Sequence, residues 1–310
     1  MNGVWLLGWM AMLSMAAPTA RSEELAGSLT CVGSDSASAL VTRWATAFQA
    51  LHPRARIQVQ AAGSASAPPA LIEAAADIGS MSRPMNARET ANFRDRYGYE
   101  PTRLVIAHDA IVVFVHPDNP VGRITIADLD AIYSTTRLCG GRMSIDHWTD
   151  LESRAHGMPA TRSILAVGRD ASSGTHELFR ESALCAGEFR PDVIAWPGNG
   201  AIVGTVSGNR AAIGYAAIGY VNGLVKTLAL ARGPDEGGVL PDAKSVTDGS
   251  YPLARDLYFY VNRPPSHALA DLPRAFVAYA LSDEGQALVR QEGFVPLIAD
   301  DRRVQRSILD

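Results

Sequence analysis

Three short segments place glycine and serine between a strand-like run and a helix-like run. They read VGSDSAS at residues 32–38, AAGSASAPP at 61–69 and VGRDASSGTH at 167–176. The first N–H groups of a helix have no partner inside the helix, and the helix dipole adds positive potential there. Such an end binds an anion readily, and glycine lets the backbone approach it closely. Together the segments predict a cage of amides and hydroxyls around an anion, although each serine alone could be an ordinary N-cap.

Arg169 is the only arginine or lysine in these segments. Its planar guanidinium can hold an oxyanion through two parallel hydrogen bonds. The neighbouring Asp170 leaves a second interpretation open, in which the two side chains form a surface ion pair. Both roles could coexist, because Asp170 could orient the guanidinium.

The same serines could belong to a hydrolase, which would need a histidine base. His176 follows Ser173 by three residues and is expected on the helix, not opposite the serine, and His108 would have to come from elsewhere in the fold. The sequence has no GxSxG elbow, no phosphate-binding P-loop and no dinucleotide fingerprint. These observations favour anion binding over catalysis.

Apolar strands alternate with helical patterns along the chain. The helix expected at 36–51 has its apolar residues at spacings of one, three and four, and that at 67–77 has proline in its first turn. This alternation predicts a parallel sheet with helices on its faces. Two long strands could cross between two lobes. The expected strands are 28–33, 56–63, 77–82, 109–117, 163–168, 210–221 and 254–262, with a helical tail around 272–281.

Length and charge narrow the class of protein. The chain has 310 residues, 47% of them hydrophobic, and a net charge of −4. It can form one large or two medium domains, and the charge argues against nucleic-acid binding. Residues 4–17 are apolar and small residues follow, which predicts a secretory signal peptide over residues 1–22. A retained N-terminal anchor is the alternative.

Export makes a disulfide possible, and the chain has three cysteines, so one must stay free. Cys31 lies in a strand-like run and is expected to be a buried thiol. Cys139 and Cys185 lie in glycine-containing, turn-like surroundings and are the better pair. No CxxC or His/Cys cluster has metal-ligand spacing, so no metal or cofactor is expected.

The chain resembles the substrate-binding proteins of phosphate ABC transporters, the PstS-like branch of the type II periplasmic binding proteins. The resemblance rests on the three segments above and on the segments SMSRPM, DAIVVFVHPDNP, AAIGYAAIGY and LYFYVN, in the family's order over residues 28 to 300. It implies an α/β fold of two lobes, each a mixed sheet flanked by helices, joined by two crossover strands. It also implies a monomeric, periplasmic protein, not an enzyme, that passes inorganic phosphate to permease subunits. Its first lobe would be residues 23–108 and 256–310, and its second 109–255.

The resemblance also assigns the anion contacts. This sequence has Ser82 where many relatives carry an aspartate that accepts the proton of bound phosphate. Asp35 could take over that role, or it could be a plain N-cap. Because the aspartate is lost at 82, another oxyanion such as sulfate, molybdate or an organic phosphate stays open as the ligand. The implied contacts are Ser34, Asp35, Ser36, Ser64, Ser82, Arg83, Arg169, Ser173, Gly174 and Thr175.

Overall fold

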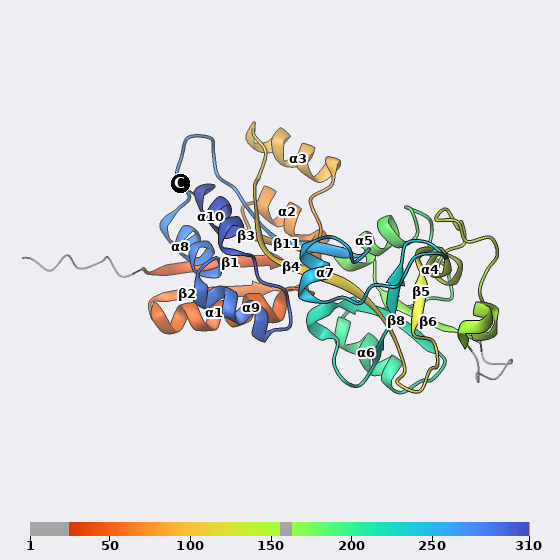
Figure 1. The fold of residues 1–310 in the computed structure, drawn as a ribbon. Helices are drawn as coiled ribbons and strands as arrows, with labels where there is room; N and C mark the ends of the chain where they lie inside the picture. Colours follow the sequence, from red (N-terminus) through yellow and green to blue (C-terminus); the bar gives the residue numbers. More distant parts are fainter. Residues whose placement is uncertain (1–24, 156–162, 310) are drawn as a thin grey trace, which may run out of the picture.

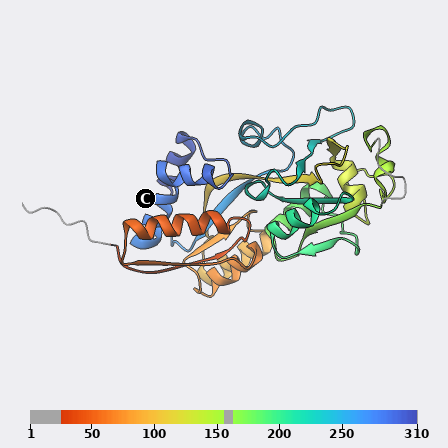
Figure 2. The ribbon, with the colours of Figure 1, turned by 90° about the horizontal axis from the view of Figure 1, so that it is seen from below.

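The computed structural model describes residues 25–155 and 163–309, so the predicted signal peptide at 1–22 lies outside the described residues. Two lobes lie at opposite ends of one long mixed sheet (Figure 1). The strand order of this sheet is β2-β1-β3-β11-β4-β8-β6-β7, with β9 paired to β4. Figure 2 shows the same two bodies from below, with α1 in one and α6 in the other.

The first lobe begins with three parallel strands, so their carboxyl ends meet at one edge of the sheet. Helix α1 covers them with a buried apolar face that includes Trp44 and Phe48. Helix α2 is shorter than the expected 67–77, and the chain turns at Ala74, which has a φ of 54°. The elements of this lobe are β1 (Gly27–Gly33), α1 (Ser38–Leu51), β2 (Ala55–Gln60), η1 (Ser64–Ser66), α2 (Ala67–Ile72), β3 (Ile78–Met81), α3 (Ala87–Tyr97), α8 (Asp271–Ala280), α9 (Asp283–Gln291) and α10 (Ala299–Ser307).

Two long strands connect the lobes. β4 (Thr102–Val115) begins earlier than the expected 109, and β11 (Ala254–Val261) lies antiparallel between it and β3. The alternation of strands and helices predicted parallel strands, and the returning β11 adds an antiparallel one, so the sheet is mixed, as the family resemblance implied. A buried ion pair joins the two strands, with Arg255 Nη2 2.6 Å from Asp109 Oδ2.

The second lobe continues the sheet from the far end of β4. There β8 pairs antiparallel with β4 and parallel with β6, and β7 forms the edge. The strand expected at 210–221 ends at Ala217, where a short 3-10 turn begins. The elements are β5 (Arg123–Thr125), α4 (Ile126–Tyr133), η2 (Trp148–Ala155), β6 (Leu165–Arg169), α5 (Gly174–Ala183), β7 (Ile194–Trp196), α6 (Asn199–Ser207), β8 (Ala212–Ala217), η3 (Ile218–Tyr220), β9 (Lys226–Thr227), β10 (Ala229–Ala231) and α7 (Ala243–Thr247).

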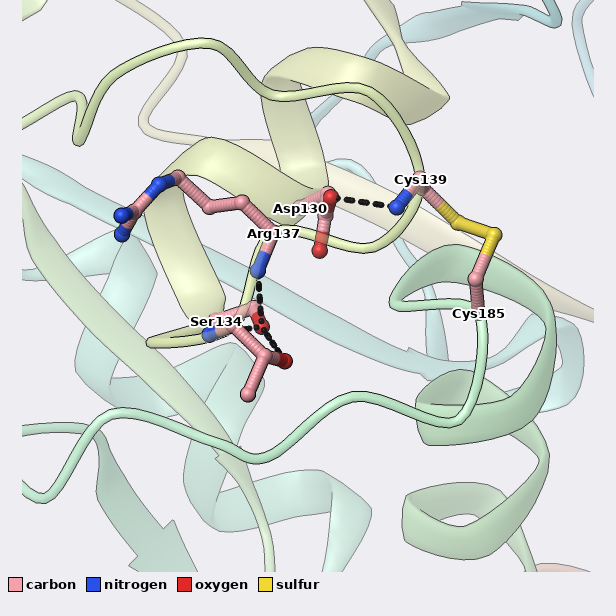
Figure 3. Close-up of a disulfide and its surroundings, with 6 residues drawn as sticks. Asp130, Ser134, Arg137, Cys139 and Cys185 are labelled. Carbon is pink, nitrogen blue, oxygen red and sulfur yellow. Dashed lines mark hydrogen bonds between the residues drawn. A yellow bond between two sulfur atoms is a disulfide. The ribbon is translucent and has the colours of Figure 1, made fainter.

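A disulfide joins Cys139, in the loop after α4, to Cys185, just after α5, as expected from the sequence (Figure 3). The backbone N–H of Cys139 donates to Asp130 Oδ2 at 2.7 Å, which holds the loop against the end of α4. Cys31 is free and buried, and burial raises the pKa of its thiol. The second lobe therefore carries the covalent cross-link.

Each lobe has its own hydrophobic core. One gathers around Trp44, Phe48 and Phe276, and the other around Phe114, Trp148 and Phe179. Among residues 25–155 and 163–309, no helix is long and apolar enough to span a membrane. No group of three acidic, histidine or cysteine side chains in that part of the chain could hold a metal.

Candidate functional site: a buried polar cleft between the lobes

The serine-bearing loops meet where the two lobes touch. Ser36 Oγ of the first lobe lies 2.8 Å from Thr175 Oγ1 of the second. The Ala65 N–H donates to the Ser172 carbonyl at 3.3 Å, again across the lobes. The site side chains that are at most 2% exposed are Ser34, Ser36, Ser64, Ser82, Arg169, Ser173 and Thr175.

Two glycines allow this close approach. A Cβ atom at Gly174 would lie 2.4 Å from Ser64 Oγ and 2.7 Å from Ser82 Oγ. A Cβ atom at Gly63, where φ is +99°, would lie 2.4 Å from the Ser172 carbonyl oxygen. At Gly63 the main chains of the two lobes therefore meet directly, and at Gly174 the main chain of the second lobe packs against the Ser64 and Ser82 side chains of the first.

Arg169 comes from the end of β6 and is almost completely buried. Its Nη2 lies 2.7 Å from Asp35 Oδ2 of the first lobe and donates to the Pro197 carbonyl at 2.9 Å. Its Nε donates to the Trp196 carbonyl at 3.2 Å. Asp170 is not its partner, because that carboxylate accepts from the Ser172 N–H and hydroxyl. The interpretation of an Arg169–Asp170 surface pair is therefore wrong.

The Arg169–Asp35 pair leaves one donor and one acceptor without partners. Among the residues that the structure describes, Arg169 Nη1 and Asp35 Oδ1 are both buried and have no hydrogen-bond partner. A buried polar atom without a partner costs about 1–3 kcal/mol. The cleft can therefore give a small ligand one charged N–H donor and one carboxylate acceptor, besides the surrounding hydroxyls.

Asp35 is not the N-cap of α1. The cap position is Ala37, and its N–H donates to Ser34 Oγ at 3.3 Å. The backbone carbonyl of Asp35, not its carboxylate, accepts from the Ser38 hydroxyl and from Tyr220 Oη. Its side chain is thus free to face Arg169.

The expected convergence of three helix starts is only partly correct. Helix α5 begins in the cleft, with Ser173 Oγ accepting from the Thr175 N–H. Helix α2 has only six residues and follows a 3-10 turn, so its dipole is weak, and α1 begins beyond the Ser34–Asp35–Ser36 turn. Hydroxyls therefore contribute more to the first-lobe side of the cleft than helix amides do.

Ser82 and Ser64 form one hydroxyl pair on the first-lobe side. Their Oγ atoms lie 3.2 Å apart, and the Ser82 N–H donates to Ser64 Oγ at 3.1 Å. Both side chains are completely buried. They offer hydroxyl groups where an aspartate would offer only an acceptor.

Arg83 was expected to contact the anion, but its guanidinium is held by carboxylates. Nη1 and Nη2 donate to Glu89 at 2.7 and 2.8 Å, and Nε lies 2.5 Å from Glu177 Oε2 of the second lobe. Burial alone would lower the pKa of Arg83, but Glu89 and Glu177 raise it above its usual value. Arg83 also lines a separate cleft of about 490 Å³ along the crossover strands, with His108 and Asp256. Because two nearby carboxylates already satisfy its charge, the geometry disfavours a side-chain contact between Arg83 and an anion.

Asn199, the first residue of α6, also reaches the cleft, although no sequence motif predicted it. Its Nδ2 lies 3.2 Å from both Asp35 Oδ2 and Ser36 Oγ, and the side chain is 1% exposed. A sequence feature could have identified it, because Asn199 follows strand β7 in a Gly-Asn-Gly turn that opens a helix, as in the three serine segments. This turn differs from those segments in having no serine.

No serine of the cleft has a histidine base beside it in the described part of the chain. Ser173 bonds to Thr175, and the His176 ring stacks on Phe189 at 4.4 Å. Two lobes joined by two strands, with a buried polar site between them, define the fold of a solute-binding protein of the periplasmic type.

The comparisons with known proteins agree with that class. A family model described as a PBP superfamily domain matches residues 18–284. The phosphate-binding protein PstS of Pseudomonas aeruginosa is 41% identical over 96% of this chain and 92% of its own length. Protein SphX of Synechococcus elongatus is 29% identical over 95% of this chain and 85% of its own. The chain belongs to the PBP superfamily and, within it, to the PstS family of substrate-binding proteins, which are not enzymes.

Solved structures share the fold. A crystal structure with bound phosphate, of a Clostridium perfringens protein assigned as a phosphate ABC transporter substrate-binding protein, superposes with a TM-score of 0.72. The two are 25% identical, over 88% of this chain and all of that one. An ABC-type phosphate transport receptor from Vibrio cholerae has a TM-score of 0.67 at 22% identity, covering 87% of this chain and all of its own. At this level of identity, the similarity to the second structure shows a shared fold.

Proposed function

We propose that the protein captures one inorganic phosphate between its lobes and delivers it to the permease subunits of an ABC transporter. The relatives named for phosphate binding and the buried polar cleft support this function. The lobes would open and close by a hinge motion at β4 and β11. The protein would act as a monomer in the periplasm, after export by the segment at 1–22. We take residues 23–108 with 256–310, and 109–255, as the moving units.

The observation that carries the proposal is the unpartnered donor and acceptor at the Arg169–Asp35 contact. Phosphate at neutral pH presents both oxygens that accept hydrogen bonds and an O–H that donates one. Arg169 Nη1 would bond an oxygen, and Asp35 Oδ1 would accept the proton. Sulfate has no proton to offer, so Oδ1 would face it without a hydrogen bond.

We propose that the residues given below contact the bound phosphate, and that the Arg83 side chain does not. The first lobe would contribute hydroxyls and the Asp35 carboxylate, and the second would contribute Arg169 and the start of α5. The set is Ser34, Asp35, Ser36, Ser64, Ser82, Arg169, Ser173, Gly174 and Thr175.

A different oxyanion, such as sulfate, molybdate or an organic phosphate, is the second candidate. The Ser64–Ser82 pair favours it, because one hydroxyl donates to the other and the remaining O–H is free to donate to an anion that carries no proton. Under this candidate, Asp35 would serve only as the ion-pair partner of Arg169.

Calorimetric titration with phosphate and with sulfate tests the proposal. We expect one phosphate per chain, bound at least about a hundredfold tighter than sulfate, since a site built to bond a ligand O–H strongly rejects the analogue that lacks it. Equal affinities would favour the second candidate. No binding of either anion would overturn phosphate capture and would also exclude sulfate as the ligand.

A further inference from the structure

Asn199 ties the first lobe to the second at the cleft. It begins α6, whose residues Ile202 and Val206 pack in the second-lobe core. Its side-chain amide donates to Asp35 and Ser36, in the loop after β1 of the first lobe. These contacts exist only while the lobes are together.

The orientation of the Asn199 amide is determined by its second contact. The Ala217 N–H, at the end of β8, donates to Asn199 Oδ1 at 3.1 Å. An N–H can bond only to the carbonyl side of an amide, so the NH₂ side must face Asp35 and Ser36. The backbone of β8 therefore holds Asn199 as a donor toward the cleft.

This donor acts on one particular oxygen of Asp35. Oδ2 receives both Arg169 Nη2 at 2.7 Å and Asn199 Nδ2 at 3.2 Å, whereas Oδ1 has no partner in the described part of the chain. Turning the carboxylate plane away from this position would break both of these bonds, whereas a half-turn only exchanges two equivalent oxygens. The carboxylate plane is therefore held with one oxygen, here Oδ1, as its open acceptor.

We propose that Asn199 is a positioning residue that sets the anion selectivity of the cleft. It does not need to touch the anion. By holding Oδ2, it keeps Oδ1 turned toward the ligand proton, and by donating to Ser36 Oγ it directs the Ser36 hydroxyl hydrogen elsewhere, toward Thr175 or the anion. This inference rests on the proposed function, in which Oδ1 accepts the proton of phosphate.

The test compares Asn199→Ala with Asn222→Ala, which removes an exposed asparagine of the same lobe whose side chain caps the Leu224 N–H. Each purified full-length protein is titrated with phosphate and with sulfate. We expect Asn199→Ala to weaken phosphate binding about tenfold or more, the range for losing a hydrogen bond to a charged group, while sulfate changes about threefold or less. Asn222→Ala should leave both unchanged.

A second variant covers the case in which alanine disturbs folding, which circular dichroism would reveal. Asn199→Ser keeps a polar group that is too short to reach Asp35, and it should lower the phosphate-to-sulfate ratio in the same way. Equal losses for both anions would mean that Asn199 only helps the lobes close, and would overturn the inference while the proposed function stands. If the unaltered protein binds no phosphate, the proposed function is wrong and the inference falls with it.

Discussion

Asp35 and Arg169 face each other from opposite lobes, with Oδ2 2.7 Å from Nη2 and side chains that are only 14% and 1% exposed. The two charges offset each other, so the pair itself adds no net charge to the cleft. An anion there must be stabilised mainly by backbone N–H and side-chain O–H groups and by the unpartnered Nη1 group of Arg169. Removing either partner would leave a buried charge without compensation, which is costly.

Arg169→Ala should weaken phosphate binding by roughly 2–4 kcal/mol, the range for truncating one partner of a buried charge pair. It should also lower the thermal stability of the second lobe, because Arg169 donates to the carbonyls of Trp196 and Pro197. Calorimetry and thermal unfolding measure the two effects. Arg169→Lys should restore only part of the affinity, since a point charge cannot make the forked contact. Unchanged phosphate affinity in Arg169→Ala would show that the arginine is purely structural.

Asp35→Asn should reduce the preference for phosphate over sulfate. The asparagine side chain has the same shape, but an NH₂ group replaces one carboxylate oxygen. Only one oxygen is then left to accept hydrogen bonds. We expect phosphate affinity to fall by about a hundredfold or more and sulfate affinity by much less. Competition of the two anions in one titration measures the ratio directly. If the phosphate-to-sulfate affinity ratio equals that of the unaltered protein, Asp35 does not determine the selectivity.

Glu177→Gln should weaken phosphate and sulfate equally. Glu177, on α5, pairs with Arg83 of the first lobe only when the lobes meet, while Glu89 keeps its bonds to Arg83 within the first lobe. Because Glu177 is partly exposed, we expect a modest loss of about 0.5–1 kcal/mol that shrinks at high salt. Glu236→Gln, which removes an exposed charge elsewhere in the second lobe, is the control. A change in the anion ratio would contradict a role limited to lobe closure.

Replacing both Cys139 and Cys185 by serine should destabilise the second lobe without affecting affinity. The bridge spans 46 residues, and in the chain-entropy model a loop of this length contributes about 4 kcal/mol to the free energy of unfolding. Urea unfolding with and without reductant measures the loss, and reductant should have no further effect on the double variant. A large fall in phosphate affinity would mean that the disulfide also shapes the cleft.

The sequence by itself identified the parts of the site that are local. Glycine and serine between a strand and a helix mark the loops at 32–38, 61–69 and 167–176, because turns and helix starts depend on neighbouring residues. The apolar spacing of residues 36–51 identified the buried face of α1 for the same reason. The cysteine pair could also be chosen from its surroundings, and the structure joins the same two residues.

Only the tertiary structure decided which of these groups bond to one another. Asp35 pairs with Arg169 and not with a helix start, Arg83 turns to Glu89 and Glu177, and Asn199 enters the cleft. Apart from Arg83–Glu89, which is a local pair within the first lobe, each contact joins residues that are far apart in the chain and on opposite lobes, so no local spacing encodes it. The antiparallel β11 arises in the same way, since the chain leaves the first lobe and returns to it. Such contacts depend on how two separately packed cores are placed by their shared strands, which sequence periodicity does not describe.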